Sequence, residues 1–250
     1  MMNRAELANI ARAEQQSWWY AGMREILLRT LDPWLAGRHI ERVLEAGCGT
    51  GYFAHTMQAE RNWPIHPVDV DAEAVRRART MGLERVTQAD VAALPFRDSA
   101  FDLVLSLDVL VHFARGEEYR PMSELKRVLA PGGLLALRVA ALDVLRSRHS
   151  QFVWERQRFT RSRLLEAVRS CGIRVLRCTY ANSLLMPVAL TKFRLCEPIL
   201  RKPPSSGVAP VSGWLDRLLR VPLALEAKWL GRGIDLPLGQ SLLLIGEKMP

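Results

Sequence analysis

Short apolar runs alternate with amphipathic stretches through most of the chain. The segments 41–47, 65–70 and 101–109 have the pattern of strands, and the last is apolar almost throughout, as in a strand covered on both faces. Strands alternating with helices at this spacing predict a doubly wound, mostly parallel α/β sheet with helices on both faces. The other strands that complete a seven-stranded sheet are expected at 84–90, 133–140, 173–180 and 240–248.

Apolar residues recur at helical spacing in the intervening segments. Two helices are expected before the first strand, and Pro33 should limit the second of them. Asp71 and Thr160 are suited to cap the N-termini of later helices, and the run 131–133 should end another. The expected helices span 5–16, 22–35, 52–60, 71–82, 120–130 and 160–173.

This pattern predicts a single domain over residues 1–250. A structureless loop of roughly 60 residues between the last two strands would be unusual in a compact domain. We therefore expect a helical insertion there, which covers a substrate site or rests on a membrane surface. The expected parts are an N-terminal helical lead-in (1–38), a cofactor-binding core (41–140) and a substrate-side half (141–250) that includes the insertion (181–238).

Composition narrows the class of protein. Apolar residues make up 49% and charged residues 24% of the 250, as in an ordinary globular protein. The sequence has no run of about 18 apolar residues, so it predicts no transmembrane helix. The N-terminal residues lack the apolar core of a signal peptide, and the four cysteines form no C-x-x-C pair, so we expect reduced thiols and a cytoplasmic location.

The positive charge is local. The net charge is +9, and residues 141–202 hold 11 arginines and two lysines against four acidic residues, which accounts for all of it. Such a segment indicates either an acidic partner or surface, or an ordinary solvated face.

A glycine-rich loop at 45–51 follows the first expected strand. Glycines at a strand-to-helix turn let a ligand approach bare backbone. The spacing is G-x-G-x-G, and Tyr52 stands where a dinucleotide-binding loop has its third glycine. Glu45 would repel a diphosphate and could accept hydrogen bonds from an ammonium group. Asp69 and Asp90, at the ends of the next two strands, could bind ribose hydroxyls and an adenine amino group.

The ordered set VLEAGCGTG, VDVDAEAVRRAR, QADVAALPFRDSAFDLVLSLDVLVHF and ELKRVLAPGGLLAL resembles class I S-adenosylmethionine-dependent methyltransferases of the small-molecule kind often called methyltransferase type 11. The resemblance implies a Rossmann-like fold, S-adenosyl-L-methionine as cofactor, S-adenosyl-L-homocysteine as product and no metal. It implies a cofactor site made of Tyr20, Arg24, Glu45, Gly47, Cys48, Gly49, Gly51, Asp69, Val70, Asp90, Val91 and Leu107.

In that site the glycine loop would surround the methionine part of the cofactor. Asp69 would hold the ribose, and Val70, Asp90 and Val91 would surround adenine. Leu107 would line the sulfonium end, while Tyr20 and Arg24 would close over the cofactor.

Catalysis of methyl transfer needs a base only when the acceptor must lose a proton. His112 and Asp108, after the fourth strand, are the candidates. Relatives commonly have Glu-His before an apolar residue there, whereas this chain reads Val111-His112-Phe113.

We expect a small-molecule acceptor with an apolar body and an acidic group, no nucleic acid, peripheral contact with an anionic membrane surface, and a monomer or homodimer. The alternatives are a nucleic-acid methyltransferase that uses the basic segment 141–202, a nicotinamide-dependent oxidoreductase and a non-catalytic cofactor-binding protein. Tyr52 and Glu45 argue against the oxidoreductase. A nucleic-acid base methyltransferase typically has an Asn/Asp-Pro-Pro-aromatic run, where this chain reads Ser106-Leu107-Asp108-Val109.

Overall fold

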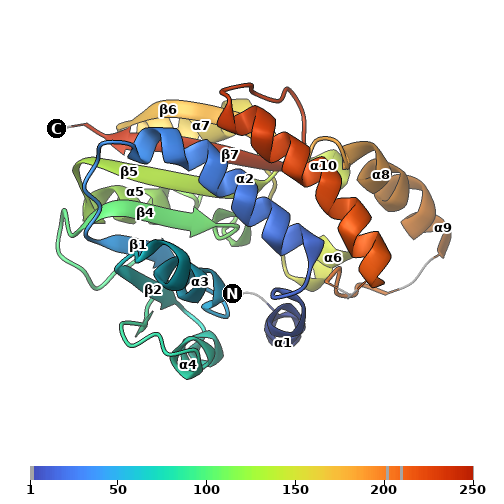
Figure 1. Cartoon of the computed structure of the whole chain (residues 1–250), viewed down its shortest axis with the longest axis horizontal. Coiled ribbons are helices and arrows are strands. Elements are labelled where there is room, and N and C mark those ends of the chain that lie inside the picture. The colour runs from blue at the N-terminus through green and yellow to red at the C-terminus, as the bar shows by residue number, and fades with distance from the viewer. Residues whose placement is uncertain (1–2, 201–202, 209–210, 250) are drawn as a thin grey trace.

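A computed structural model describes residues 3–200, 203–208 and 211–249 of the chain. A seven-stranded sheet in the order β3-β2-β1-β4-β5-β7-β6 forms its centre (Figure 1). Strand β7 runs antiparallel to both of its neighbours, and the other neighbours pair in parallel, which confirms the predicted mostly parallel Rossmann-like sheet. The strands are β1 (Val43–Ala46), β2 (Ile65–Asp69), β3 (Thr87–Gln88), β4 (Phe101–Leu107), β5 (Leu129–Ala140), β6 (Ile173–Ala181) and β7 (Ser241–Lys248).

Helices flank the sheet, and further helices lie between β6 and β7. The longer ones are α1 (Arg4–Ala13), α2 (Trp18–Leu35), α3 (Tyr52–Arg61), α4 (Ala72–Thr80), α5 (Tyr119–Val128), α7 (Arg161–Ser170) and α10 (Gly213–Gly231). The shorter ones are η1 (Leu110–His112), η2 (Asp143–Leu145), α6 (Arg148–Phe152), α8 (Met186–Thr191), the π-helical turn η3 (Lys192–Cys196) and α9 (Glu197–Leu200). No helix in the described ranges is long and apolar enough to cross a membrane.

The capping predictions are confirmed, and α5 ends earlier than predicted. The side chains of Asp71 and Thr160 accept hydrogen bonds from backbone N–H groups in the first turns of α4 and α7, as expected. Pro33 lies in the last turn of α2, which ends at Leu35 as predicted and begins earlier, at Trp18. Helix α5 ends at Val128, before the 131–133 run, because the residue ahead of a proline disfavours helical backbone. That run lies within β5 instead.

Two helices far apart in sequence, α2 and α10, lie side by side on one face of the sheet (Figure 1). Met23 and Ile26 of α2 and Leu223 and Leu230 of α10 are fully buried in the same apolar core. Helices α5 and α7 contribute to the core on the opposite face. The last part of the predicted insertion is therefore core packing, and α8, η3 and α9 extend beyond the sheet.

Candidate functional site

The glycine loop 45–51 joins the end of β1 to the start of α3. The backbone N–H of Gly47 donates to the carbonyl oxygen of Val68 at 2.8 Å, which holds the loop against β2. Gly47 has φ +89°, a left-handed conformation that other residues rarely adopt. Gly51 has φ +84°, and a Cβ there would lie 2.6 Å from the Cβ of Ala78 on α4. These glycines keep the loop tight and its backbone bare at the carboxyl edge of the sheet.

Asp69, the last residue of β2, ties two turns together. Its Oδ2 accepts from the backbone N–H of Gly49 at 2.8 Å, and its Oδ1 accepts from that of Asp71 at 2.9 Å. Burial raises the pKa of Asp69. A carboxylate has about four acceptor sites, so its remaining lone pairs can accept hydroxyl donors. The ribose contact predicted for Asp69 is compatible with this arrangement.

Two buried carboxyl groups lie at the glycine-loop end of the site. Glu45 on β1 is 3% exposed, and its Oε2 has no hydrogen-bond partner among the described residues. Glu14, which ends α1, accepts from the Thr50 hydroxyl at 2.6 Å through Oε2, while its Oε1 has no such partner. Burial raises the pKa of Glu14 to about 7. Burial, with the nearby charges of Asp69 and Glu14, raises the pKa of Glu45 well above its usual range. Unpaired buried carboxyl oxygens suit a cationic ligand, as the ammonium and sulfonium of the implied cofactor would be.

A cavity of about 1090 Å³ runs along this edge of the sheet. Pockets for one small molecule usually have about 300–1,000 Å³, so there is room for a cofactor and a second molecule. The cavity is lined by eleven of the twelve residues predicted to bind the cofactor and by both predicted catalytic residues. Gly51 is not among the lining residues, because it packs against α4. The predicted residues that line it are Tyr20, Arg24, Glu45, Gly47, Cys48, Gly49, Asp69, Val70, Asp90, Val91, Leu107, Asp108 and His112.

The side of the cavity predicted for adenine is more open. Val91 is buried, whereas Val70 is 40% exposed. Asp90 is exposed, and its Oδ1 accepts from the backbone N–H of Ala92 at 2.9 Å. The second carboxylate oxygen of Asp90 is thus left for a ligand.

Helix α2 supplies the two predicted residues from the lead-in. The Tyr20 ring packs edge-on against Trp19 with centroids 5.0 Å apart, and burial raises the pKa of its phenol. The guanidinium of Arg24 lies 3.8 Å from the carboxylate of Glu60, a loose ion pair. Both side chains line the cavity, as their predicted roles require.

The two candidate catalytic residues differ in their partners. The Oδ2 atom of Asp108 lies 2.7 Å from Nη2 of Arg138, whose guanidinium also lies over the Trp19 ring at 5.1 Å. Asp108 is therefore engaged in an ion pair. His112 lies in η1, its buried Nδ1 has no partner among the described residues, and burial lowers its pKa, so the ring is neutral near pH 7. Of the two, His112 has the free nitrogen that a base needs.

Comparisons with known proteins match the part of the chain that forms the glycine-loop end of the site. Residues 44–137 match the family model described as "Methyltransferase domain". The chain is 31% identical over 135 residues to malonyl-[acyl-carrier protein] O-methyltransferase of Erwinia billingiae, a match of 54% of this chain and 53% of the relative. It is 38% identical over 104 residues to "Probable tRNA methyltransferase 9B" of Mus musculus, a match of 40% of this chain and 22% of the relative.

Among solved structures, a geranyl diphosphate methyltransferase in complex with GPP and sinefungin has the same fold. The TM-score is 0.58 at 17% identity, with 92% of this chain and 78% of that one covered. The match covers about half of the Erwinia billingiae relative and less than a quarter of the Mus musculus relative. The family match includes the glycine loop, Asp69 and the end of β4.

Residues 44–137 thus form a domain of the class I S-adenosylmethionine-dependent methyltransferase type.

Beyond the matched range, the cavity continues into a second, largely apolar end. We call it the acceptor end, for the methyl acceptor that the sequence predicts. The insertion and α1 supply its wall. His149 of α6 closes one side, since its Nδ1 accepts from the backbone N–H of Gly207 at 2.9 Å and lies 3.5 Å from Oε1 of buried Glu6. The apolar lining residues here are Leu7, Ile10, Leu185, Val188, Ala189, Phe193, Val208, Val211 and Leu219.

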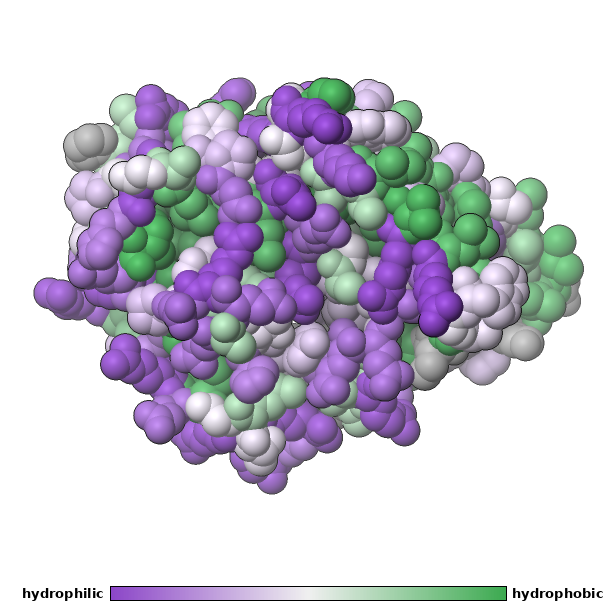
Figure 2. All heavy atoms as spheres, in the orientation of Figure 1, coloured by the Kyte–Doolittle hydropathy of each residue, from purple (hydrophilic) through white to green (hydrophobic). Residues whose placement is uncertain are grey.

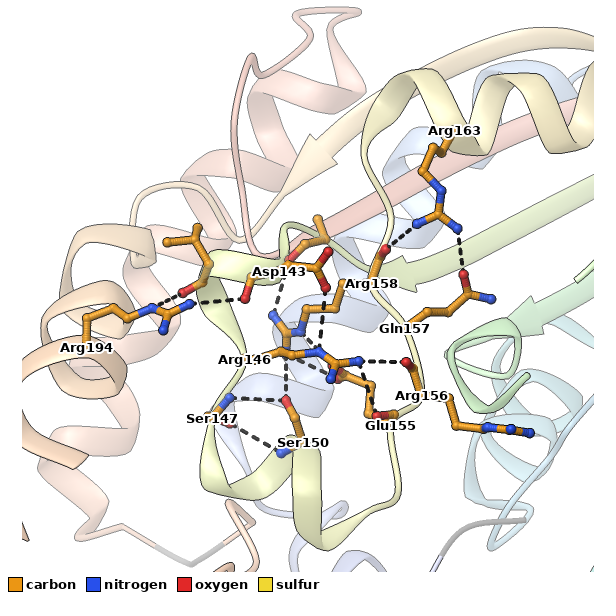
Figure 3. A network of polar contacts seen from close by, with 12 residues as sticks. Asp143, Arg146, Ser147, Ser150, Glu155, Arg156, Gln157, Arg158, Arg163 and Arg194 are labelled. Atoms are coloured by element: carbon orange, nitrogen blue, oxygen red, sulfur yellow. Dashed lines mark hydrogen bonds and ion pairs between the residues drawn. The ribbon is translucent and has the colours of Figure 1, made fainter. Parts of the chain in front are cut away.

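Most arginines of the basic segment have partners within the chain (Figure 3). Arg158 lies 2.7 Å from Glu155 and also donates to the Ser150 hydroxyl at 3.0 Å. Arg146 donates to the carbonyl of Arg156 at 2.7 Å. Arg194, on η3, donates to the carbonyl of Val144 at 2.7 Å and so anchors the insertion to the segment after β5. These arginines hold the acceptor end together, and the open basic field expected from the count is much reduced.

One cation at the acceptor end is not fully paired. Arg148 lines the cavity, and its Nε and Nη1 are buried without a hydrogen-bond partner among the described residues. The nearest carboxylate, that of Glu197, lies 3.7 Å from Nε. Arg201 and Lys202, which contribute to the basic count, lie outside the described residues.

Sequence reasoning missed Glu6, Glu14, Arg138 and Arg148 as cavity residues. An acid on an amphipathic helix usually faces solvent, so nothing in the sequence marked Glu6 and Glu14 as buried. Arg148 was part of the counted charge, but only the folded chain distinguishes it from its paired neighbours.

Proposed function

We propose that the chain transfers a methyl group from S-adenosyl-L-methionine to a small-molecule acceptor with an apolar body and an acidic group. The observation that carries this proposal is one continuous cavity with two unlike ends. The glycine-loop end has unpaired acidic oxygens, and the acceptor end combines apolar walls with the unpaired guanidinium N–H groups of Arg148.

When bound, the cofactor supplies a sulfonium-borne methyl group that leaves by in-line displacement. The chain's own task is to hold the two molecules in line, which supplies about 7–11 kcal/mol of a barrier in favourable cases. Arg148 would fix the acidic group of the acceptor, and the neutral imidazole of His112 would take a proton where the acceptor must lose one. Asp108, bound to Arg138, would position that arginine rather than act as the base.

Two similarities support the acceptor class. The bacterial relative is named for a malonyl-[acyl-carrier protein], and the solved neighbour was seen with GPP. A malonyl group is an acyl group with an acidic end. GPP, a geranyl diphosphate, combines an apolar chain with a diphosphate.

The test is release of S-adenosylhomocysteine on incubation with S-adenosylmethionine and a matched acceptor panel. The panel holds a medium-chain fatty acid, the matching alcohol, the matching amine, a prenyl diphosphate and short polar acids. Turnover that needs both the apolar chain and the acidic group supports the proposal. Turnover with the amine alone, or with polar acids alone, contradicts it.

A second candidate is a tRNA acceptor, which the mouse relative's name favours. That match spans 40% of this chain, and the family match covers the cofactor half. Bulk tRNA in the same assay separates the two candidates, because binding of a nucleic acid weakens steeply with salt. Salt-sensitive turnover of tRNA, with none of any small acceptor, would replace the first candidate by the second.

A further inference from the structure

Helix α10 is apolar on two faces, and only one of them is covered. Its inner face packs on α2, where Leu223 is fully buried and would meet any side chain placed at Gly22. Its outer face carries Trp214, Leu218, Val221 and Leu225, which are 69%, 57%, 55% and 41% exposed. Their spacing of four, three and four residues places them in one stripe. A surface helix normally presents polar residues there.

The neighbouring segment α8–α9 adds a second exposed apolar group. Val188, Leu195, Ile199 and Leu200 are 63%, 59%, 79% and 54% exposed. Figure 2 shows hydrophobic atoms gathered over the end of the molecule that α8, α9 and α10 form. We call these eight residues, four on α8–α9 and four on α10, the apolar end surface. Contiguous exposed apolar surface of this kind marks a site of contact with a protein or a membrane.

The charges around the apolar end surface are basic. Arg217 and Lys228 are exposed on α10, and the structure gives neither an ion-pair partner among the described residues. The acidic groups of α9 and α10 are already engaged. Asp216 pairs with Arg220 at 2.7 Å, Glu197 accepts from the backbone N–H of Arg148 at 2.9 Å, and Glu226 is buried and accepts from the backbone N–H groups of residues 183 and 184.

This charge pattern distinguishes between a membrane and a second copy of the chain as partners of the apolar end surface. Apolar side chains including a tryptophan, flanked by lysine and arginine, are the composition of a helix that lies in a membrane interface. A second copy of the chain would bring the same basic rim against itself, and like charges across an interface oppose association. Anionic lipid headgroups complement the rim.

The apolar end surface is continuous with the acceptor end of the cavity. Val188 and Val211 line the cavity and are also 63% and 36% exposed. We propose that the apolar end surface docks peripherally on an anionic lipid bilayer, with α10 and α8–α9 in the interface. Docked in this way, the chain holds the apolar rim of its cavity against the lipid. Docking itself does not depend on the proposed function.

The test is flotation of the full chain with vesicles of phosphatidylcholine alone or with about a third phosphatidylglycerol, at low and high salt. We expect binding to the anionic vesicles only. The double variant L218Q/V221Q should lose at least tenfold in vesicle affinity, and R217Q/K228Q should lose both affinity and its salt dependence. The control M249Q changes a 49% exposed methionine near the C-terminus, at the opposite end of the molecule from α9, and should bind as the wild type does.

Thermal unfolding of each variant should match the wild type, since the substituted side chains are exposed. Absence of vesicle binding, equal binding to both vesicle types, or equal loss in M249Q would overturn the proposal. A wild-type dimer in size-exclusion chromatography that L218Q/V221Q dissociates, without vesicle binding, would assign the apolar end surface to self-association instead. None of these readouts involves methyl transfer, so failure here leaves the proposed function standing.

Discussion

The two ends of the cavity are built by different means. At the glycine-loop end, backbone geometry places the polar groups: a strand end, a left-handed glycine and a helix start fix the positions of Asp69 and the loop N–H groups. At the acceptor end, side chains from α1, α6 and the insertion meet through contacts distant in sequence, such as that of His149 with Gly207. The first end carries the family match, and the second lies mostly beyond it. If the proposed function is right, backbone groups hold the cofactor, which the family shares, and side chains hold the acceptor.

The largest expected effect is a change in the free energy of unfolding, which should differ between the two faces of α10. Replacing Leu223 by alanine should cost about 2–5 kcal/mol of unfolding free energy, because a buried leucine leaves a cavity. Leu218→Gln on the outer face should change it by less than about 0.5 kcal/mol. Urea denaturation measures both. Equal losses would mean that the outer stripe is also a structural contact.

At the cofactor end, Asp69→Asn keeps the shape of the side chain and removes its charge. Hydrogen bonds to a charged group contribute about 1.5–3 kcal/mol each, so affinity for S-adenosylhomocysteine should fall at least about tenfold. Isothermal titration calorimetry gives the value, with circular dichroism as the check on folding. Unchanged affinity would remove Asp69 from the ribose site.

At the acceptor end, Arg148→Met keeps the apolar stem and removes the guanidinium. The KM for an acidic acceptor should rise about tenfold, or about 1.4 kcal/mol, while affinity for S-adenosylhomocysteine stays the same. Arg146→Met is the matched control, because that arginine bonds to backbone carbonyls. A KM that rises equally in both variants would contradict a specific role for Arg148.

The smallest effect concerns pH. The pKa of Glu14 is about 7 in the folded chain against an ordinary value of 4.5, because the carboxyl group is buried. The folded state therefore takes up a proton between these values, so Glu14 contributes stability below pH 4.5 that is lost as pH rises through 7. Glu14→Gln should raise the Tm of the ligand-free chain at pH 8 and leave it unchanged at pH 4.5.

The same carboxylate should favour a cationic ligand once it ionises. Wild-type affinity for S-adenosylhomocysteine should rise as pH goes from 6 to 8, and this rise should be smaller in Glu14→Gln. An equal rise in both proteins would mean that Glu14 does not face the ligand's ammonium group.

Sequence predicted those features that local backbone rules determine. The caps at Asp71 and Thr160, the glycine loop and the alternation of strands with helices follow from short-range patterns. The burial of Glu14 and the pairing of Asp108 with Arg138 do not, because each depends on a partner from another element. The basic segment shows the same limit, since a charge count cannot tell a fully hydrogen-bonded arginine such as Arg158 from Arg148, whose Nε and Nη1 lack hydrogen-bond partners among the described residues.

We infer that the glycine-loop end of the cavity holds S-adenosylmethionine. A thermal-shift comparison of S-adenosylhomocysteine, S-adenosylmethionine, NAD and NADP tests it most directly. A ligand at 100 times its Kd adds about 2.7 kcal/mol, and each kcal/mol moves the Tm of a chain of this size by about 2–4 °C. We expect a rise of about 5–10 °C with the two adenosyl-sulfur ligands and none with the nicotinamide ligands. A rise with NAD or NADP, or with none of the four, would contradict it.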